Sequence, residues 1–276
     1  MSTLGIIAGG GELPRAIAES ARKDGRSVFV LAINGSTDAW ASDHPHEWVG
    51  LGETGKAMKA LKTAGCADVL LAGRIERPKF TELKIDAKGL LALPRVLSAA
   101  VKGDDALLRA MVDLFEREGF HVIGAAEAAP GLIATAGLLG KLAPNAENES
   151  DITLGFEIVR ALGALDVGQA AVVCAGLPLA VEAAEGTDAM IARINTLPEH
   201  FRGTPAKRRG VLVKAPKPIQ DGKTDLPVIG VQTVENAAAA GLSGIALEVG
   251  GALIVGREAV AGAADRLGLF VIGVPR

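Results

Sequence analysis

The alternation of strand-length apolar runs with helical patterns constrains the fold of this 276-residue chain more than any other feature. The apolar runs in the first half are residues 4–8, 27–33, 68–72 and 120–124. The helical patterns between them are residues 13–23, 55–64 and 90–118, the last broken near Gly103. Strands that alternate with helices favour a parallel sheet with helices on both faces. We therefore predict an α/β fold that begins with a Rossmann-like N-terminal domain.

The second half resumes this alternation after a change in composition. Residues 125–148 mix Ala, Gly and Pro with turn residues, so we place an N-terminal domain at 1–130, an interdomain linker at 131–148 and a second α/β domain at 149–276. Ser150 or Asp151 is expected to cap a helix that runs to about Ala164. Further strands are expected at 170–174, 211–213, 228–231, 245–247, 252–255 and 269–272, and helices at 188–195, 234–240 and 258–267.

Composition excludes some classes of function. Hydrophobic residues make up 49% of the chain, enough for a packed core. The net charge of −3 and the nine aromatic side chains, with no Tyr, argue against a nucleic-acid partner. Cys66 and Cys174 lie in apolar settings and are expected to be buried thiols in a reducing compartment. No signal-peptide pattern and no apolar stretch of about 18 residues is present, which indicates a cytoplasmic protein.

Residues 211–234 carry the strongest functional signal. Three prolines exclude a regular helix there, Pro216, Pro218 and Pro227, so two extended pieces must flank a stiff loop. That segment holds Lys214 and Lys217, which can neutralise phosphate, and Asp221 and Asp225, whose carboxylates can hold Mg²⁺. Together these groups suit chemistry on a phosphoric anhydride.

The glycine run 9–11 follows the first predicted strand and precedes a helix. Such a turn presents backbone N–H groups to a phosphate or another polar ligand, although a ligand-free tight turn has the same pattern. The dinucleotide-binding fingerprint is not met: Pro14 occupies the third small-residue position, and Asn34 ends the second strand where NAD enzymes carry an acid.

Two acidic groups precede predicted helices. Asp104 and Asp105 open one helix, and a plain N-cap explains them as well as a site does. A denser group offers four oxygen ligands within seven residues: Glu182, Glu185, Thr187 and Asp188. Basic residues gather between 202 and 223; Lys207, Arg208 and Arg209 among them form either a solvated loop or a contact with anionic lipid headgroups.

Several blocks together resemble a known family, the LpxI-type UDP-2,3-diacylglucosamine pyrophosphatases. They are GIIAGGGELP at the N-terminus, GRIERP (73–78), GDDALLR (103–109), VGQAAVVCAG (167–176), VEAAEGTDAMIAR (181–193) and residues 211–234. The resemblance spans nearly the whole chain. It implies two α/β domains and Mg²⁺-dependent hydrolysis of UDP-2,3-diacylglucosamine to UMP and 2,3-diacylglucosamine 1-phosphate in lipid A biosynthesis. It also implies a cytoplasmic enzyme that is peripheral at the inner membrane.

The resemblance and the residue chemistry together give a candidate site. Asp225 matches the family's catalytic aspartate and is expected to bind Mg²⁺ or to activate water. The expected metal shell is Asp104, Asp188, Asp221 and Asp225. The expected substrate-binding residues are Gly10, Gly11, Glu12, Gln169, Thr187, Lys214 and Lys217.

Two alternatives stay open. The glycine turn and the Rossmann-like domain also suit a nicotinamide-dependent oxidoreductase, and the phosphate-binding features also suit a non-catalytic nucleotide-sugar sensor. The sequence leaves homo-oligomer formation open.

Overall fold

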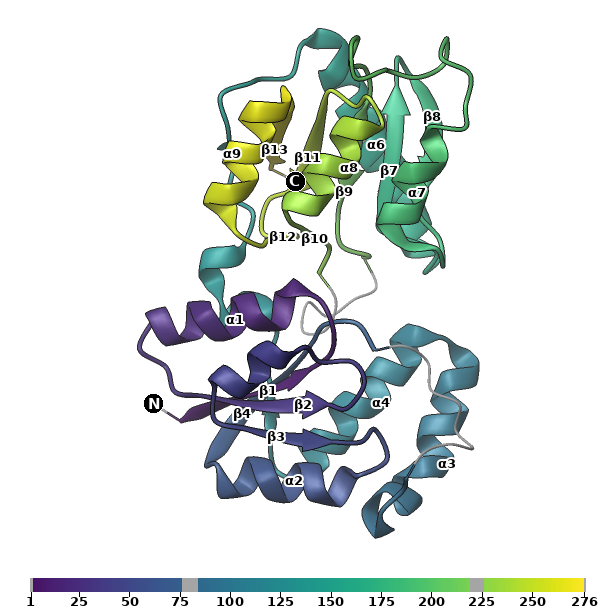
Figure 1. The fold of residues 1–276 in the computed structure, drawn as a ribbon. Helices are drawn as coiled ribbons and strands as arrows, with labels where there is room; N and C mark the ends of the chain where they lie inside the picture. The colour runs from purple at the N-terminus through teal and green to yellow at the C-terminus, as the bar shows by residue number, and fades with distance from the viewer. Residues whose placement is uncertain (1, 76–83, 219–225, 276) are drawn as a thin grey trace. The chain divides into compact units, whose positions relative to one another are not determined.

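A computed structural model describes residues 2–75, 84–218 and 226–275, without the side chains of residues 102, 104 and 105. The chain forms two compact units, Met1–Gly131 (unit 1) and Leu132–Arg276 (unit 2). Figure 1 shows a sheet with helices in each of them. No helix among the described residues combines the length and the apolar character needed to cross a bilayer.

Unit 1 is built on a five-stranded sheet in the order β3-β2-β1-β4-β5, in which every neighbouring pair is parallel. Its strands are β1 (Thr3–Ala8), β2 (Val28–Ile33), β3 (His46–Val49), β4 (Cys66–Ala72) and β5 (His121–Val122). Its helices are α1 (Glu12–Lys23), η1 (Ala39–Asp43), α2 (Thr54–Thr63), α3 (Ala87–Lys102), α4 (Asp104–Arg117), α5 (Ala125–Ala128) and η3 (Pro130–Leu132), which extends one residue into unit 2. In Figure 1, α1 and α2 lie on opposite faces of the sheet. The core on the α2 side joins Met58 and Leu61 of α2 to Phe115 of α4.

Unit 2 contains a mixed six-stranded sheet in the order β6-β13-β11-β9-β7-β8. Its strands are β6 (Gly137–Leu138), β7 (Ala170–Cys174), β8 (Leu177–Val181), β9 (Val211–Lys214), β11 (Gly244–Glu248) and β13 (Phe270–Val274), and β10 (Val228–Ile229) pairs separately with β12 (Leu253–Ile254). Its helices are α6 (Ala146–Ala164), α7 (Gly186–Ile194), α8 (Val231–Ala239) and α9 (Arg257–Leu267). One core packs α6 against the sheet, and another packs α7, α8 and α9 against it.

The predicted α/β class and the parallel N-terminal sheet are confirmed. The helical pattern at 90–118 is broken at Gly103, whose φ of 126° lies in a region that L side chains rarely adopt. Three short edge strands, β3, β6 and β8, were not predicted. Cys66 and Cys174 are both free and buried.

The start of α6 corrects the predicted cap. The helix begins at Ala146, where Asn145 and Asn148 form a capping box: each side chain accepts the other residue's backbone N–H. Asp151 is instead completely buried one turn later, and its carboxylate accepts the N–H groups of Ala175 and Gly176 in the β7–β8 turn.

The expected linker at 131–148 is corrected as well. All but its first residue belong to unit 2, because β6 pairs antiparallel with β13 and α6 begins inside the segment. Ala134 is buried in the core that packs α7, α8 and α9. The small Ala and Gly residues of this segment therefore serve close packing and not a tether.

Candidate functional site

In unit 1, the predicted glycine turn joins β1 to α1 and packs against the end of β4. The N–H of Gly10 donates to the carbonyl of Arg74 (2.8 Å), and the N–H of Arg74 donates back to Gly10 (2.9 Å). A Cβ on Gly9 would lie 2.5 Å from the Arg74 carbonyl oxygen, and one on Gly10 would lie 2.8 Å from that of Ser36. Gly9 and Gly10 are therefore required by the close approach of these backbones.

Gly11 differs from its two neighbours. Its φ is 91°, and the space around a Cβ there is open to 4 Å among the described atoms. It precedes the first turn of α1, which carries the exposed side chain of Glu12. Because the N–H of Gly10 is already bonded, Gly11 and the first N–H groups of α1 are the backbone groups best placed to meet a ligand.

In unit 2, charged side chains gather at one edge of the sheet. Lys214 ends β9 and Glu248 ends β11, the strand parallel to β9. Gln169 and Glu182 reach the same edge, because β7 is antiparallel to β9 and β8 is antiparallel to β7. Open α/β sheets bind ligands outside the carboxyl ends of their parallel strands. This edge is the candidate site of unit 2.

A buried chain of hydrogen bonds joins the groups at this edge. Lys214 is only 3% exposed, and its Nζ donates to Thr187 Oγ1 (2.9 Å) and to the carbonyl of Val228 (3.2 Å). The Thr187 hydroxyl donates to Glu182 Oε1 at 2.5 Å, and Glu182 Oε2 accepts the backbone N–H of Gln169 at 3.0 Å. Glu182 is 7% exposed, so an ammonium and a carboxylate are held out of water with one hydroxyl between them.

The backbone around Glu182 is fixed by close packing. A Cβ on Gly168 would lie 2.1 Å from the carbonyl oxygen of Glu182, so only glycine fits there. The N–H of Glu182 donates to the carbonyl of Ala170 and continues the β7–β8 ladder. The carboxylate is therefore placed by the sheet itself.

Gln169 supplies one further polar atom. Its Oε1 is buried and has no hydrogen-bond partner among the described residues. A buried acceptor left without a partner costs roughly 1–3 kcal/mol, so such atoms in native structures call for an explanation. A ligand that donates to this oxygen is one explanation, and it agrees with the predicted binding role of Gln169.

Two other predicted residues have different partners. Lys217 forms an ion pair with Asp166 (Nζ–Oδ1, 2.8 Å) near the C-terminus of α6. Asp188 lies in the first turn of α7, where its Oδ1 accepts a hydrogen bond from Asn236 Nδ2 of α8 (2.9 Å). No described contact joins either residue to the Lys214 chain.

The predicted metal shell lies mostly outside the described part of the chain. Asp221 and Asp225 are outside the described residues, and the side chain of Asp104 is not described, although Asp104 begins α4 as predicted. Among residues 2–75, 84–218 and 226–275, no group of three or more His, Cys, Asp or Glu side chains is placed to hold a metal ion. The described carboxylates do not form a metal site by themselves.

The basic run 207–209 is mostly structural. Arg208 Nη1 donates to the carbonyls of Ala238 and Leu242 at the end of α8, and burial lowers the pKa of its guanidinium. Arg209 bonds Glu147 of α6. Cations commonly satisfy the free carbonyls at a helix C-terminus.

Comparisons with known proteins identify the family of this chain. The family model of the LpxI N-terminal domain matches residues 3–132, and that of the LpxI C-terminal domain matches residues 135–272. This chain belongs to the LpxI family. One relative from Caulobacter vibrioides, UDP-2,3-diacylglucosamine pyrophosphatase LpxI, is 51% identical over 274 residues, which is 99% of this chain and 98% of the relative.

Likenesses to solved structures are weak. N5-carboxyaminoimidazole synthetase from Staphylococcus aureus is 17% identical, with a TM-score of 0.24 over 62% of this chain and 38% of its own. Glycinamide-RNase-transformylase T from Mycobacterium tuberculosis is 13% identical, with a TM-score of 0.22 over 66% of this chain and 44% of its own. Neither likeness bears on fold or function.

Sequence reasoning placed Lys214, Thr187 and Gln169 at the site but omitted Glu182. The signal was present, because Glu182 is one of the four oxygen ligands in the 182–188 group. The sequence could not tell which of the four turns inward. The structure shows that Glu182 does, because it directly follows the last residue of β8.

Proposed function

We propose that this chain hydrolyses the pyrophosphate bond of UDP-2,3-diacylglucosamine and releases UMP and 2,3-diacylglucosamine 1-phosphate. The observation that carries the proposal is the 51% identity, over 99% of the chain, to a relative named as a UDP-2,3-diacylglucosamine pyrophosphatase. Both family models together span nearly every residue, so the likeness is not limited to one unit.

The edge of the unit 2 sheet supports this chemistry. A pyrophosphate diester is an anion, and its cleavage needs positive charge near the phosphoryl oxygens. Lys214 brings an ammonium to the carboxyl end of a central strand, and Thr187 and the Val228 carbonyl orient it. Glu182, joined to Lys214 through the Thr187 hydroxyl, offsets part of the cost of burying that ammonium.

Mg²⁺ is part of the proposal. Bound Mg²⁺ would neutralise phosphoryl oxygens and orient water. Asp221 and Asp225 would hold it, with Asp104, whose side chain is not described; Asp188 could join them only by giving up its bond to Asn236. Asp225 is the proposed catalytic residue, on the strength of its place in the 211–234 block.

The remaining roles follow from position. Gly10, Gly11 and Glu12 are proposed to contact the nucleotide or the sugar. Gln169 Oε1 is proposed to accept a hydrogen bond from substrate. Lys217 is proposed as a second phosphate contact, which requires its ion pair with Asp166 to open. The proposed location is cytoplasmic and peripheral at the inner membrane.

Product release tests the proposal directly. Purified protein incubated with UDP-2,3-diacylglucosamine should release UMP, measured by chromatography, together with the lipid 1-phosphate, measured by phosphorus NMR. EDTA should stop the release and excess Mg²⁺ should restore it. An intact substrate after long incubation with folded, Mg²⁺-supplied protein would refute hydrolysis and would favour the nucleotide-sugar sensor.

Variants test the residues. Asp225→Asn should abolish most turnover while substrate still binds. Lys214→Met should also lose most turnover, whereas Lys207→Met, which removes the same charge from an exposed position, should keep it. If Lys214→Met turned over like the control, the charged edge of unit 2 would not be the reacting site.

A further inference from the structure

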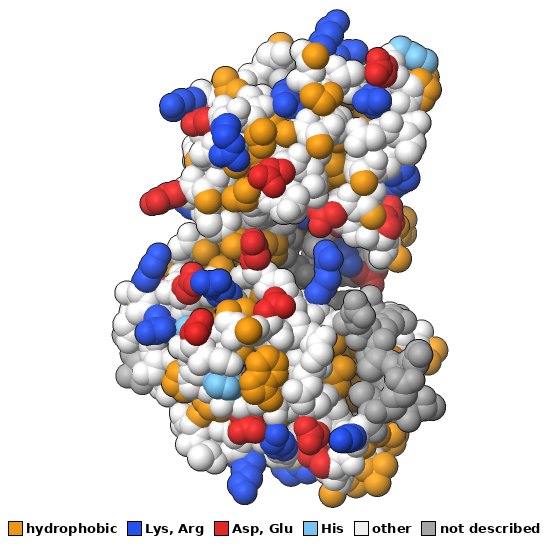
Figure 2. All heavy atoms as spheres, viewed as in Figure 1, with side chains coloured by type: hydrophobic (Ala, Val, Ile, Leu, Met, Phe, Trp, Pro, Cys, Tyr) orange, Lys and Arg blue, Asp and Glu red, His pale blue; other side chains and the backbone are white. Residues whose placement is uncertain are grey.

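Helix α3 of unit 1 exposes several large apolar side chains. Leu90, Leu91 and Val101 are 63%, 83% and 89% exposed, and Leu97 is 39% exposed. Single exposed hydrophobic residues are common, but contiguous apolar surface marks a binding face. Figure 2 shows hydrophobic side chains at the surface of unit 1 beside Lys and Arg side chains.

The exposed residues form a continuous stripe. At about 100° per residue, four exposed positions of α3 fall within an arc of about 60°. We define the apolar stripe as these four residues, Leu90, Pro94, Leu97 and Val101. Leu91 lies at one margin of the stripe. Gly89, the one buried position among the described side chains of α3, lies about 110° from the middle of the stripe.

Basic side chains lie next to that margin. Lys88 and Arg95 are about 20° apart on the same wheel, just beyond Leu91. The sequence of α3 contains three basic residues and no acidic one. Lys88 also lines an open hollow of about 440 Å³ between α2 and α3, to which Lys59 and Lys62 of α2 contribute.

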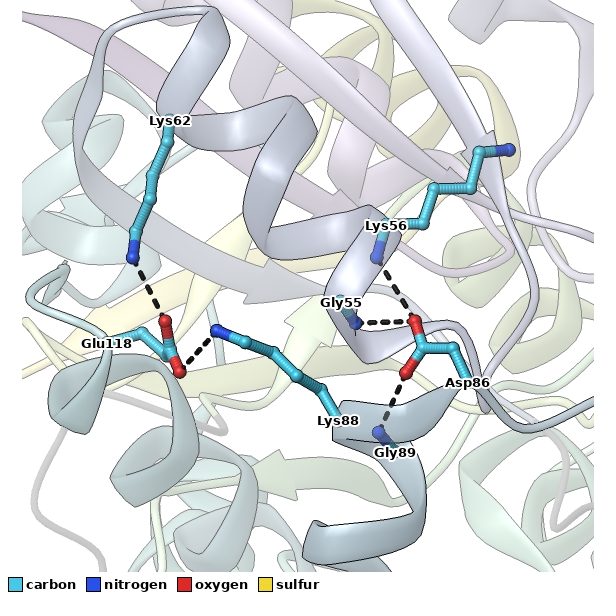
Figure 3. A network of polar contacts seen from close by, with 7 residues as sticks. All are labelled: Gly55, Lys56, Lys62, Asp86, Lys88, Gly89 and Glu118. Atoms are coloured by element: carbon cyan, nitrogen blue, oxygen red, sulfur yellow. Dashed lines mark hydrogen bonds and ion pairs between the residues drawn. The ribbon is translucent and has the colours of Figure 1, made fainter.

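Two carboxylates hold the first turn of α3. Glu118, next to the end of α4, accepts from Lys88 (2.7 Å) and from Lys62 (2.9 Å), and these bonds hold the pKa of its carboxyl below the usual range. Asp86 accepts N–H groups from Gly55 and Lys56 of α2 and from Gly89 of α3 (Figure 3). These bonds tie the first turn of α3, where the stripe begins, to α2 and to the residue that follows α4.

The charge pattern identifies the partner. An amphipathic helix with a Leu-rich face and basic residues at its margin lies at the interface of an anionic bilayer, where the apolar face enters the acyl boundary and the cations meet headgroups. A second copy of the chain would bring the same acid-free helix against itself and set like charges side by side. The bilayer satisfies both parts of the pattern, and self-association satisfies only one.

We propose that the apolar stripe of α3, Leu91 and the lysine-lined hollow form a docking surface for an anionic lipid bilayer. The apolar residues enter the acyl boundary, while Lys59 and Arg95 contact phosphate headgroups. This inference does not depend on pyrophosphatase activity, because docking needs no substrate. It does give a lipid-handling enzyme a way to stay at the surface that contains its substrate.

Vesicle binding tests the docking surface. Full-length protein is incubated with vesicles of equal parts phosphatidylglycerol and phosphatidylcholine, or of phosphatidylcholine alone, and bound protein is measured by co-flotation at low and high salt. We expect binding to the anionic vesicles, at least about tenfold weaker binding to the neutral ones, and weakening by salt.

Matched variants separate the contributions. Leu91→Glu with Val101→Glu should weaken binding at least about tenfold, since both side chains leave the acyl boundary. Leu165→Glu is the control, because Leu165 is 76% exposed in unit 2 and lies outside the proposed surface. Lys59→Glu with Arg95→Glu should remove the preference for anionic lipid. Equal binding of the α3 variant and the control would overturn the proposal.

Oligomeric state separates the bilayer from a second copy. Light scattering behind size exclusion, without vesicles, should give the same mass for wild type and for Leu91→Glu with Val101→Glu. If wild type formed an oligomer that the double variant lost, and neither bound vesicles, the stripe would be a self-association surface and the bilayer assignment would be wrong. Loss of UMP release has no bearing on either outcome.

Discussion

We predict that the Thr187 hydroxyl stabilises the arrangement of Lys214 and Glu182 in unit 2. Thr187→Val removes this hydroxyl with little change in the shape of the side chain. The hydroxyl both donates to Glu182 Oε1 (2.5 Å) and accepts from Lys214 Nζ (2.9 Å). A hydrogen bond to a charged group contributes about 1.5–3 kcal/mol. Lys214 keeps the Val228 carbonyl and Glu182 keeps the Gln169 N–H, so the lower figure applies to each lost bond. We expect unit 2 to lose about 3 kcal/mol of stability.

Thr187→Ser is the matched control. It keeps the hydroxyl and removes one partly exposed methyl, which costs less than about 0.8 kcal/mol. The difference between Val and Ser therefore measures the hydroxyl bridge. Because about 1.4 kcal/mol corresponds to a factor of ten in an equilibrium constant, the expected loss of stability corresponds to roughly 100-fold faster exchange of amide hydrogens.

Hydrogen exchange measured by mass spectrometry is the suitable assay. Both tryptophans, Trp40 and Trp48, lie in unit 1, so their fluorescence does not report on unit 2. Amides of the central strand β9 should exchange roughly 100-fold faster in the Val variant than in the Ser variant when opening is limited by unit 2 stability. Turnover should fall with Val and be retained with Ser, because Lys214 keeps its charge but loses its orientation.

Equal exchange in the two variants would refute this reasoning. The hydroxyl would then contribute no net stability, and Lys214 would be held by other groups. If the β9 amides exchanged equally slowly in both variants but only Thr187→Val lost turnover, Thr187 would contact substrate directly and would not stabilise the fold.

Three further predictions concern stability and thiol reactivity. Asp86→Ala removes the carboxylate that caps both α2 and α3, and at about 1 kcal/mol per cap it should cost about 2 kcal/mol in urea unfolding followed by Trp fluorescence; an unchanged midpoint would contradict the double cap. Burial raises the pKa of Asp86, but N–H bonds from Gly89, Lys56 and Gly55 outweigh it and leave the pKa below its ordinary value. The difference in stability between wild type and variant should therefore be full above the ordinary pKa of an aspartate, about 3.9, and should shrink as the pH falls through the lower folded pKa. Asp151→Ala leaves the N–H groups of Ala175 and Gly176 without their acceptor and should cost about 3 kcal/mol, read as faster exchange of β7 amides, while Ser150→Ala, at the neighbouring exposed position, should not. Burial raises the pKa of Cys66 to about 11, so its reaction with a disulfide reagent at neutral pH should be slow until urea unfolds unit 1; immediate labelling would show that the strand end is open.

The sequence predicted the buried strands and missed three of the edge strands, β3, β6 and β8. Strands β1, β2 and β9 contain continuous apolar runs because both faces of each are covered, and β4 contains such a run from Val69 to Ala72. In β3 only Val49 is buried, so HEWV has no clear pattern. The edge strand β8 contains Pro178, which an edge position tolerates but a sequence pattern takes as a break.

The residues of the candidate site also divide into those that the sequence could identify and those that it could not. Lys214 and Gln169 could be selected because each flanks a strand that is visible in the sequence. The inward turn of Glu182 depends on β8, which the sequence did not reveal, and so does the hydroxyl bridge of Thr187. The partners of Lys217 and Asp188 are set by contacts between elements far apart in sequence, Asp166 with Lys217 and Asn236 with Asp188. Periodicity within one element carries no information about such pairs.

Helix α3 shows the same limit of sequence periodicity. Its apolar periodicity is that of a helix packed on a protein core. Periodicity alone does not distinguish a helix face that packs on a core from one that binds a lipid bilayer. What distinguishes them is the disposition of charge: α2 places its lysines around a hollow, α3 adds Lys88 and Arg95, and the acidic Glu118 is already engaged by two ammonium groups. In unit 2 the opposite holds, because Lys214 is enclosed and joined through Thr187 to Glu182. In unit 2, the buried Lys214 belongs to a hydrogen-bonded network that suits a single anion. In unit 1, the cations are exposed beside leucines, a pattern that suits an extended anionic surface.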